Sequence, residues 1–328
     1  MNEQEALSKL TLPSMPRPTI WRKGILQVMI TRACGRQCCG CSQGSQLGGK
    51  PMMMTPAQAE EAFDSLEGYT GVVGCFGGSP ALNPHFEEIC EIMMKKIPDG
   101  QRGIWADNTH GKGAIMRKCF TPYHSNINVH QDVAAADAFR MEWPECAPYI
   151  KGETGDSRHG PPLVAMQDLD ALPFPDGSVR ENTLENRWEL ISGCEISKYW
   201  SALIGVFRGE LRAWGCEIAA AQSMLHASEP DYPDTGMKVT PGWWKKPMED
   251  FASQYRYHCH ACGIPLRGWG ALAITENSDQ VSKTHASIFK PKSKDRLVEL
   301  VVRQEQLGER HLPRSTDYIS NGSLPIIQ

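Results

Sequence analysis

Four of the twelve cysteines in the 328-residue chain stand within eight consecutive positions, in the stretch ACGRQCCGCSQG. Three of them, Cys34, Cys38 and Cys41, have the spacing C-x3-C-x2-C, which lets one loop bring three thiolates to a single metal cluster. Iron–sulfur clusters are held by such cysteine runs, and three ligands for a four-iron cube leave one iron open to a non-protein ligand. A structural zinc ion normally takes four protein ligands, and the fourth cysteine, Cys39, directly adjoins Cys38. The loop therefore favours a cluster.

The composition of the whole chain indicates the kind of cellular compartment in which the protein works. Twelve cysteines in 328 residues are too few and too clustered for a disulfide scaffold, which favours metal binding in a reducing compartment. The N-terminal stretch has no apolar core of signal-peptide length, and no apolar run reaches the roughly 18 residues that span a bilayer. We therefore expect a cytoplasmic protein without a membrane partner. A net charge of -4 indicates no overall attraction to nucleic acid.

The elements that must position this loop alternate between strands and helices. Apolar runs predict strands at residues 25–31, 71–76, 102–107 and 125–130, with a fifth candidate at 162–168. Helical patterns follow them, and the first has Thr55 as N-cap and Pro56 at the first helical position. This alternation predicts a parallel sheet, either a partial barrel or a doubly wound sheet. Active residues are then expected where the strands end.

The pattern changes in the second half of the chain. From about residue 180 the sequence becomes less periodic and rich in tryptophan and glycine, and it carries four more cysteines. We interpret this region as a smaller second module. The segment DRLVELVVRQEQL, residues 295–307, predicts an amphipathic helix. Four other cysteines are expected to be small buried side chains: Cys75, Cys90, Cys119 and Cys146.

The order of these features resembles the radical SAM superfamily over roughly residues 24–170. The cysteine loop follows the first predicted strand, and the turn GGSP follows the second. The resemblance implies a partial (β/α)6-type TIM barrel and a [4Fe-4S] cluster on Cys34, Cys38 and Cys41. It also implies that S-adenosylmethionine (SAM) chelates the open iron and that a flavodoxin- or ferredoxin-type protein donates the electron. Cleavage of SAM would then produce a 5′-deoxyadenosyl radical, which abstracts hydrogen from the substrate.

The resemblance also implies contacts to SAM. The glycine-rich turn that holds the methionine end corresponds here to Gly77, Gly78, Ser79 and Pro80. Asn108 and His130 stand at strand ends where the family contacts the adenosine. Two positions depart from the family pattern, because Gly40 replaces the aromatic residue before the third cysteine and Ser79 replaces the usual acidic residue of the turn. Neither departure changes the expected cluster ligands.

The later cysteines resemble the auxiliary-cluster modules called SPASM or, in shortened form, Twitch. The residues that carry this resemblance are Cys194, Cys216, Cys259 and Cys262. By count they bind a second [4Fe-4S] cluster or a zinc ion equally well, and the resemblance favours the cluster. His258 and His260 are expected to be neighbours of the ligands or surface residues rather than ligands themselves. The predicted organisation is an N-terminal extension (1–23), a barrel core (24–180), a Twitch-like module (181–290) and a C-terminal helix and tail (291–328).

Two function hypotheses follow. The first is a radical SAM enzyme of isomerase or oxidoreductase type that acts on an unreactive C–H position of a peptide or a nucleotide-linked substrate, a modified DNA base included. The alternative is a zinc-stapled nucleic-acid-binding protein without catalysis, which would be colourless and free of labile sulfide. The net charge of -4 gives no sign of the basic face that a nucleic-acid-binding protein needs.

Overall fold

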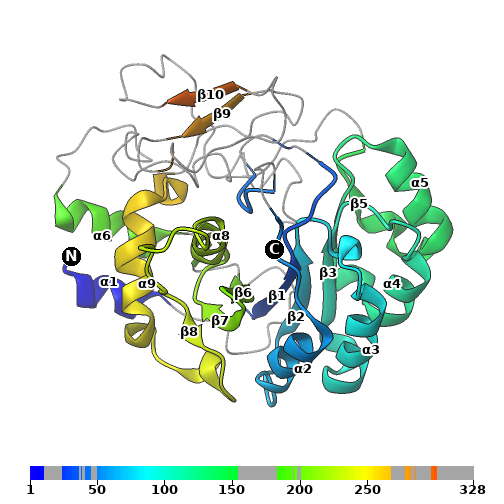
Figure 1. Ribbon diagram of the computed structural model, residues 1–328, viewed down its shortest axis with the longest axis horizontal. Coiled ribbons are helices and arrows are strands. Elements are labelled where there is room, and N and C mark those ends of the chain that lie inside the picture. The colour runs from blue at the N-terminus through cyan, green and yellow to red at the C-terminus, as the bar shows by residue number, and fades with distance from the viewer. Residues whose placement is uncertain are drawn as a thin grey trace.

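An eight-stranded open sheet organises the chain (Figure 1), in the strand order β5-β4-β3-β2-β1-β6-β7-β8. The computed structural model describes residues 1–10, 24–36, 38, 41–45, 50–153, 183–194, 196–197, 201–266, 278–281, 285 and 297–300. The strands of the sheet are β1 (Ile25–Thr31), β2 (Val72–Gly77), β3 (Arg102–Ala106), β4 (Asn126–Asn128), β5 (Ile150–Lys151), β6 (Ser201–Phe207), β7 (Glu210–Trp214) and β8 (Met237–Lys238). Strands β1 to β5 pair in parallel, as the alternation of strands and helices predicts.

The helices form two groups around this sheet. Helices α2 (Pro56–Asp64), α3 (Phe86–Lys96), α4 (Gly113–Cys119) and α5 (Val133–Glu142) lie along the outer side of the parallel strands in Figure 1. Helices α1 (Glu3–Lys9), α6 (Leu184–Gly193) and α9 (Ala252–His258) gather on the other side of the molecule, with α8 (Glu217–Leu225) nearer the centre. Within the described residues, no helix is long and apolar enough to cross a membrane.

Strand β1 is the centre of the sheet and is buried along its whole length. Alternate side chains of a strand point to opposite faces, and Leu26, Val28 and Ile30 accordingly pack in the core under the outer helices. Ile25 and Met29 pack on the other face, in a second apolar cluster. Because both faces are covered, the strand is an almost continuous apolar run rather than an alternating one.

The second half of the chain joins this sheet at the free edge of β1. Strand β6 pairs in parallel with β1, Ile25 to Val28 opposite Ser201 to Ile204. Strand β7 then turns back antiparallel to β6. The region predicted as a second module is therefore continuous with the barrel strands through one sheet, and its predicted boundaries stay a prediction.

Local sequence signals match the structure where they are strongest. The first strand has the predicted bounds, and Thr55 caps α2 in a reciprocal capping box with Gln58. Cys75, Cys90, Cys119 and Cys146 are all buried, at 1% exposed or less, which confirms the expectation for them. The fifth candidate strand, 162–168, lies outside the described residues, and strand β5 is formed by Ile150–Lys151.

The predicted helix at 295–307 is wrong for its described part. Residues Leu297–Leu300 form strand β10, which pairs in parallel with β9 (Ser278–Val281). The β-branched Val298 suits a pleated strand better than a helix. Partner backbone groups of β9 then satisfy hydrogen bonds that a helix would have satisfied within the segment.

Candidate functional site

The cysteine loop begins where β1 ends, after Thr31. Cys38 is buried at 9% exposed, whereas Cys34 and Cys41 are partly exposed. Burial raises the pKa of the Cys38 thiol well above its ordinary value, and neighbouring Cys41 and Cys34 raise it further. The three sulfurs therefore lie close enough to interact. Thiols in such a position become thiolates when a metal supplies the compensating positive charge.

The GGSP turn packs directly against this loop. The Gly78 N–H donates to the Thr31 carbonyl at 3.0 Å, and the Ser79 N–H donates to the Ala33 carbonyl at 2.7 Å. A Cβ on Gly78 would stand 2.4 Å from the Ala33 carbonyl oxygen and 2.9 Å from the Cys34 Cβ. Only glycine allows this approach of two backbones. Gly78 is also partly exposed while the other three residues of the turn are buried, so its backbone forms the accessible surface of the turn.

Ser79 is linked to the end of β3 through a histidine that the sequence analysis did not select. The Ser79 hydroxyl lies 2.9 Å from His110 Nε2. Asn108 Oδ1 accepts a hydrogen bond from the His110 backbone N–H at 2.8 Å, in a turn that places His110 at a positive φ of 49°. The predicted contact of Asn108 with adenosine remains a prediction, and its side-chain oxygen shapes this turn. The signal for His110 was its place in DNTHG, just after a buried strand.

His130 reaches the cysteine loop from the end of β4. Its Nδ1 lies 4.0 Å from Cys38 Sγ, and its backbone N–H donates to Asn128 Oδ1 at 3.2 Å. His130 and the next residue, Gln131, both have positive φ angles, of 51° and 65°. Non-glycine residues in this region are uncommon and often mark functional sites. The structure thus brings the predicted His130 beside a predicted cluster ligand.

Two arginines of the loop were missed by sequence reasoning, Arg32 and Arg36. The Arg32 guanidinium donates to the carbonyls of Gln43 and Gly44, at 3.4 and 3.3 Å, and to the Met224 carbonyl of α8 at 3.5 Å. Burial lowers the pKa of Arg32 to about 10. Arg32 therefore fastens the far end of the cysteine loop to β1 and α8. Arg36 makes a separate set of contacts, described below.

Comparison with known proteins matches one segment of the chain to a family. Residues 28–118 match the family model described as Radical SAM superfamily. The chain carries a radical SAM domain. The matched segment contains the cysteine loop, the GGSP turn and Asn108. The superfamily implies a [4Fe-4S] cluster and SAM, and this match to a superfamily of enzymes favours the enzymatic hypothesis over the zinc-stapled binding protein.

Other comparisons add little to the radical SAM assignment. No curated protein sequence matches the chain. Among solved structures, one described as "Crystal structure of BtrN in complex with AdoMet and 2-DOIA" aligns with 76% of this chain and 93% of its own, at 10% identity and a TM-score of 0.39. Similarity at this level establishes neither substrate nor reaction for the radical SAM chain.

A second group of thiols lies outside the matched radical SAM segment. Cys194 follows α6, Cys216 caps α8, and Cys259 and Cys262 flank the short turn η8 (Cys259–Ala261) after α9. Burial raises the pKa of Cys216 to about 12, and Cys194 raises it further. Burial also raises the pKa of Cys259, and neighbouring Cys216, Cys194 and Cys262 raise it further. Four cysteines from three segments thus influence one another, and their predicted role as metal ligands stays a prediction.

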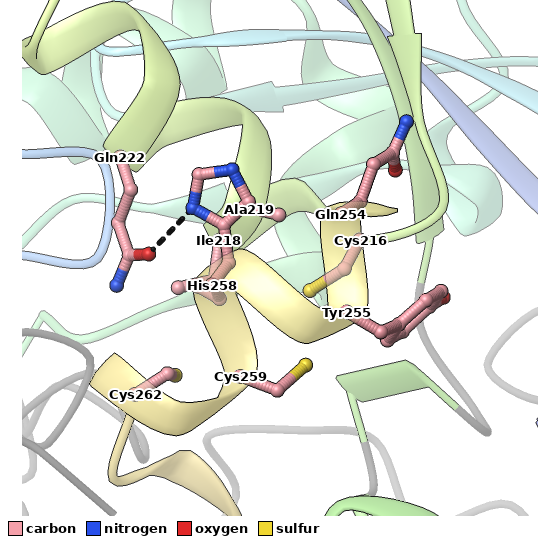
Figure 2. A pocket seen from close by; sticks show the side chains of 9 residues that line it. All are labelled: Cys216, Ile218, Ala219, Gln222, Gln254, Tyr255, His258, Cys259 and Cys262. Atoms are coloured by element: carbon pink, nitrogen blue, oxygen red, sulfur yellow. Dashed lines mark hydrogen bonds between the residues drawn. The ribbon is translucent and has the colours of Figure 1, made fainter. Parts of the chain in front are cut away.

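Three of these thiols, Cys216, Cys259 and Cys262, border a small pocket. Figure 2 shows the side chains of Cys216 and Cys259 pointing toward the same space, with Cys262 on the turn after α9. The other lining residues are Ile218, Ala219, Gln222, Gln254, Tyr255 and His258. Among the residues that the structure describes, no group of three or more His, Cys, Asp or Glu side chains is placed to hold a metal ion. The assignment of a metal to either cysteine group therefore rests on the chemistry of the thiol donors.

His258 lies beside the second thiol group and is occupied by hydrogen bonds. Its Nδ1 lies 3.0 Å from Gln222 Oε1, and its Nε2 lies 2.8 Å from Thr235 Oγ1 and 3.1 Å from Ser223 Oγ (Figure 2 shows the first of these contacts). Burial lowers its pKa to about 3, so the ring is neutral. Both ring nitrogens are engaged in these contacts, and the expected place of His258 beside a metal stays a prediction.

Proposed function

We propose that this radical SAM enzyme abstracts hydrogen from an unreactive C–H position of a peptide or a nucleotide-linked substrate, a modified DNA base included, and that rearrangement or oxidation follows. The observation that carries the proposal is the direct packing of the GGSP turn on the cysteine loop. Two backbone hydrogen bonds, from Gly78 and Ser79, join the two segments. A group bound at the turn is thereby held beside whatever the thiols bind.

The donors of the loop suit the proposed cofactors. Cys34, Cys38 and Cys41 supply three sulfur ligands, which fit a [4Fe-4S] cluster with one iron left for the amino and carboxylate groups of SAM. When bound, these groups supply the 5′-deoxyadenosyl radical that abstracts hydrogen, while the protein supplies orientation and exclusion of water. An electron donor of flavodoxin or ferredoxin type is part of this proposal, as is a cytoplasmic location.

The chain's own residues orient SAM. The exposed backbone of Gly78 meets the methionine end without a side chain in the way. Ser79 keeps His110 at the edge of the turn through their 2.9 Å contact. Asn108 and His130, at the ends of β3 and β4, would contact the adenosine. The burial of Cys38 and of the whole of β1 keeps water from the inner side of the loop.

Formation of 5′-deoxyadenosine tests the proposed function. Anaerobically reconstituted protein, reduced with dithionite in the presence of SAM, is expected to be coloured and to release 5′-deoxyadenosine. A colourless protein that holds zinc and no labile sulfide would support the nucleic-acid-binding alternative instead. Substrate class is tested by adding either a peptide pool or a nucleotide and DNA pool, because a true substrate raises the yield of 5′-deoxyadenosine above the level without substrate.

We also propose that Cys194, Cys216, Cys259 and Cys262 hold a second [4Fe-4S] cluster, with zinc as the alternative. Three of the four thiols, Cys216, Cys259 and Cys262, line one pocket, and Cys194 influences the pKa of Cys259 and Cys262, which supports a metal site. A single zinc ion requires all its sulfurs about 2.3 Å from one point, whereas the ligands of a cube bind different irons and stand farther apart. Residues 181–290 then form the Twitch-like module, after the barrel core of 24–180.

Gly78→Ala is expected to weaken SAM binding at least about tenfold, which corresponds to about 1.4 kcal/mol. The new Cβ would stand 2.4 Å from a backbone oxygen, so either the turn or the cysteine loop must move. Isothermal titration of the reconstituted protein with SAM measures the effect. Gly100→Ala is the control, because a Cβ there meets nothing within 4 Å. Unchanged affinity in Gly78→Ala would remove the turn from the site.

A further inference from the structure

Arg36 stands midway between two of the proposed cluster ligands, Cys34 and Cys38, and its side chain leaves the loop. Its Nε donates to Asp107 Oδ2 at 2.7 Å, and one terminal nitrogen donates to the Asp107 carbonyl and to Asp132 Oδ2, both at 3.2 Å. The Arg36 side chain is 18% exposed and that of Asp107 is 8% exposed, so their ion pair is largely withdrawn from water. Pairs of this kind have definite geometry, unlike exposed ones.

The partners of Arg36 belong to two different strand–helix units. Asp107 directly follows β3, and Asp132 is the N-cap of α5, where its Oδ1 accepts from the Ala135 N–H at 3.0 Å. The planar guanidinium thus connects the cysteine loop to both units at once. Lysine cannot reproduce such a fork, because its ammonium is a point charge on a flexible stem.

The backbone of Arg36 reaches the sulfur directly. Its N–H donates to Cys34 Sγ at 3.4 Å. Arg36 is separated from Cys34 and from Cys38 by one residue each, so it brings a positive charge into the cysteine loop. A hydrogen bond to a ligand sulfur and a nearby positive charge both stabilise the more negative, reduced state of an iron–sulfur cluster, because reduction adds negative charge.

We propose that Arg36 is a positioning residue for the radical chemistry, one that holds its own N–H on Cys34 and its charge beside the cluster, and thereby raises the cluster's reduction potential. The inference rests on the proposed function, because it takes Cys34, Cys38 and Cys41 as cluster ligands. Asp107 and Asp132 are the anchors of this arrangement. Without the guanidinium, their two carboxylates would instead oppose reduction of the cluster.

Arg36→Gln tests the proposal, with Arg36→Lys as the variant that keeps the charge and loses the fork. Arg117→Gln is the matched control, since Arg117 is an exposed arginine that pairs with Glu145 on the outer surface. The reduction potential is measured by titration of the paramagnetic signal that changes when SAM is added, which selects the cluster of the loop. Iron content and the rate of 5′-deoxyadenosine formation are measured on the same samples.

Arg36→Gln is expected to retain iron, to have a more negative potential, and to form 5′-deoxyadenosine about ten- to hundredfold more slowly, as is usual when partners around metal ligands are lost. Arg36→Lys should fall between Arg36→Gln and the wild type. In metal-free protein, amide exchange at residues 34–36 should quicken in Arg36→Gln and not in Arg117→Gln. If Arg36→Gln loads no iron, the reduction potential of the cluster in Arg36→Lys tests the proposal in its place.

Two outcomes are kept apart by this design. A potential equal to that of the wild type in each Arg36 variant that loads iron would overturn the role of Arg36 and leave the proposed function intact. A wild-type protein that shows no SAM-responsive signal and forms no 5′-deoxyadenosine would instead overturn the proposed function itself.

Discussion

Replacing Cys34, Cys38 and Cys41 together by alanine is expected to lower 5′-deoxyadenosine formation to the level measured without enzyme. These thiols are the proposed ligands of the cluster through which the electron reaches SAM, and no other described cysteine lies in this loop. Loss of the ligands removes the cluster rather than slowing one step, so the effect should be complete. Chromatography of the reaction products after anaerobic reduction with dithionite measures it.

The matched control for this experiment is Cys39→Ala in the same stretch. Cys39 falls outside the C-x3-C-x2-C spacing, so its removal should leave both iron content and 5′-deoxyadenosine near wild-type values. Undiminished 5′-deoxyadenosine from the triple variant would contradict the assignment of the ligands. Loss of activity in Cys39→Ala alone would show that the ligand set has been chosen wrongly within the loop.

Iron content is expected to report two clusters. Fully loaded protein should hold about eight irons per chain, two cubes of four. Removal of either cysteine group should lower the iron content to about four per chain. The first group is the three cysteines of the loop, and the second is Cys194, Cys216, Cys259 and Cys262. Because the four later thiols come from three segments of the chain, their metal should also contribute to stability, as bound metals that tie segments together do. Elemental analysis and thermal unfolding measure both effects.

Cys146→Ala is the control for the second group, since Cys146 is a buried thiol outside both groups. The Cys146→Ala variant should keep about eight irons per chain. Its free energy of unfolding should fall only by the small contribution of one buried side chain. A wild-type protein that holds one zinc ion and about four irons per chain would show that the second cysteine group binds structural zinc instead of a cluster. Radical chemistry in the first site would be unaffected by that result, because zinc has no redox role.

The largest local features of this protein were readable from the sequence. Three cysteines within eight positions can share one cluster in any fold that leaves their loop free to wrap, so their spacing alone indicates the chemistry. The apolar run of β1 and the cap of α2 at Thr55 are equally local, and the structure has both as predicted. The second group of cysteines is proposed as a metal site from its count and spacing, because a metal site demands several thiols, and this stays a prediction.

Tertiary structure decided what joins these features. Strand β6 pairs with the free edge of β1 and not with the free edge of β5 at the other end of the sheet. No local pattern selects between these two edges, because either can accept a strand from later in the chain. The helix predicted near residue 300 is strand β10 because β9 offers a partner that no local pattern announces. Arg36 meets Asp107 and Asp132, 71 and 96 positions later, only once β3 and β4 lie side by side in the sheet. Contacts between side chains so far apart depend on how strands order in space, and this order is a property of the whole core rather than of any one segment.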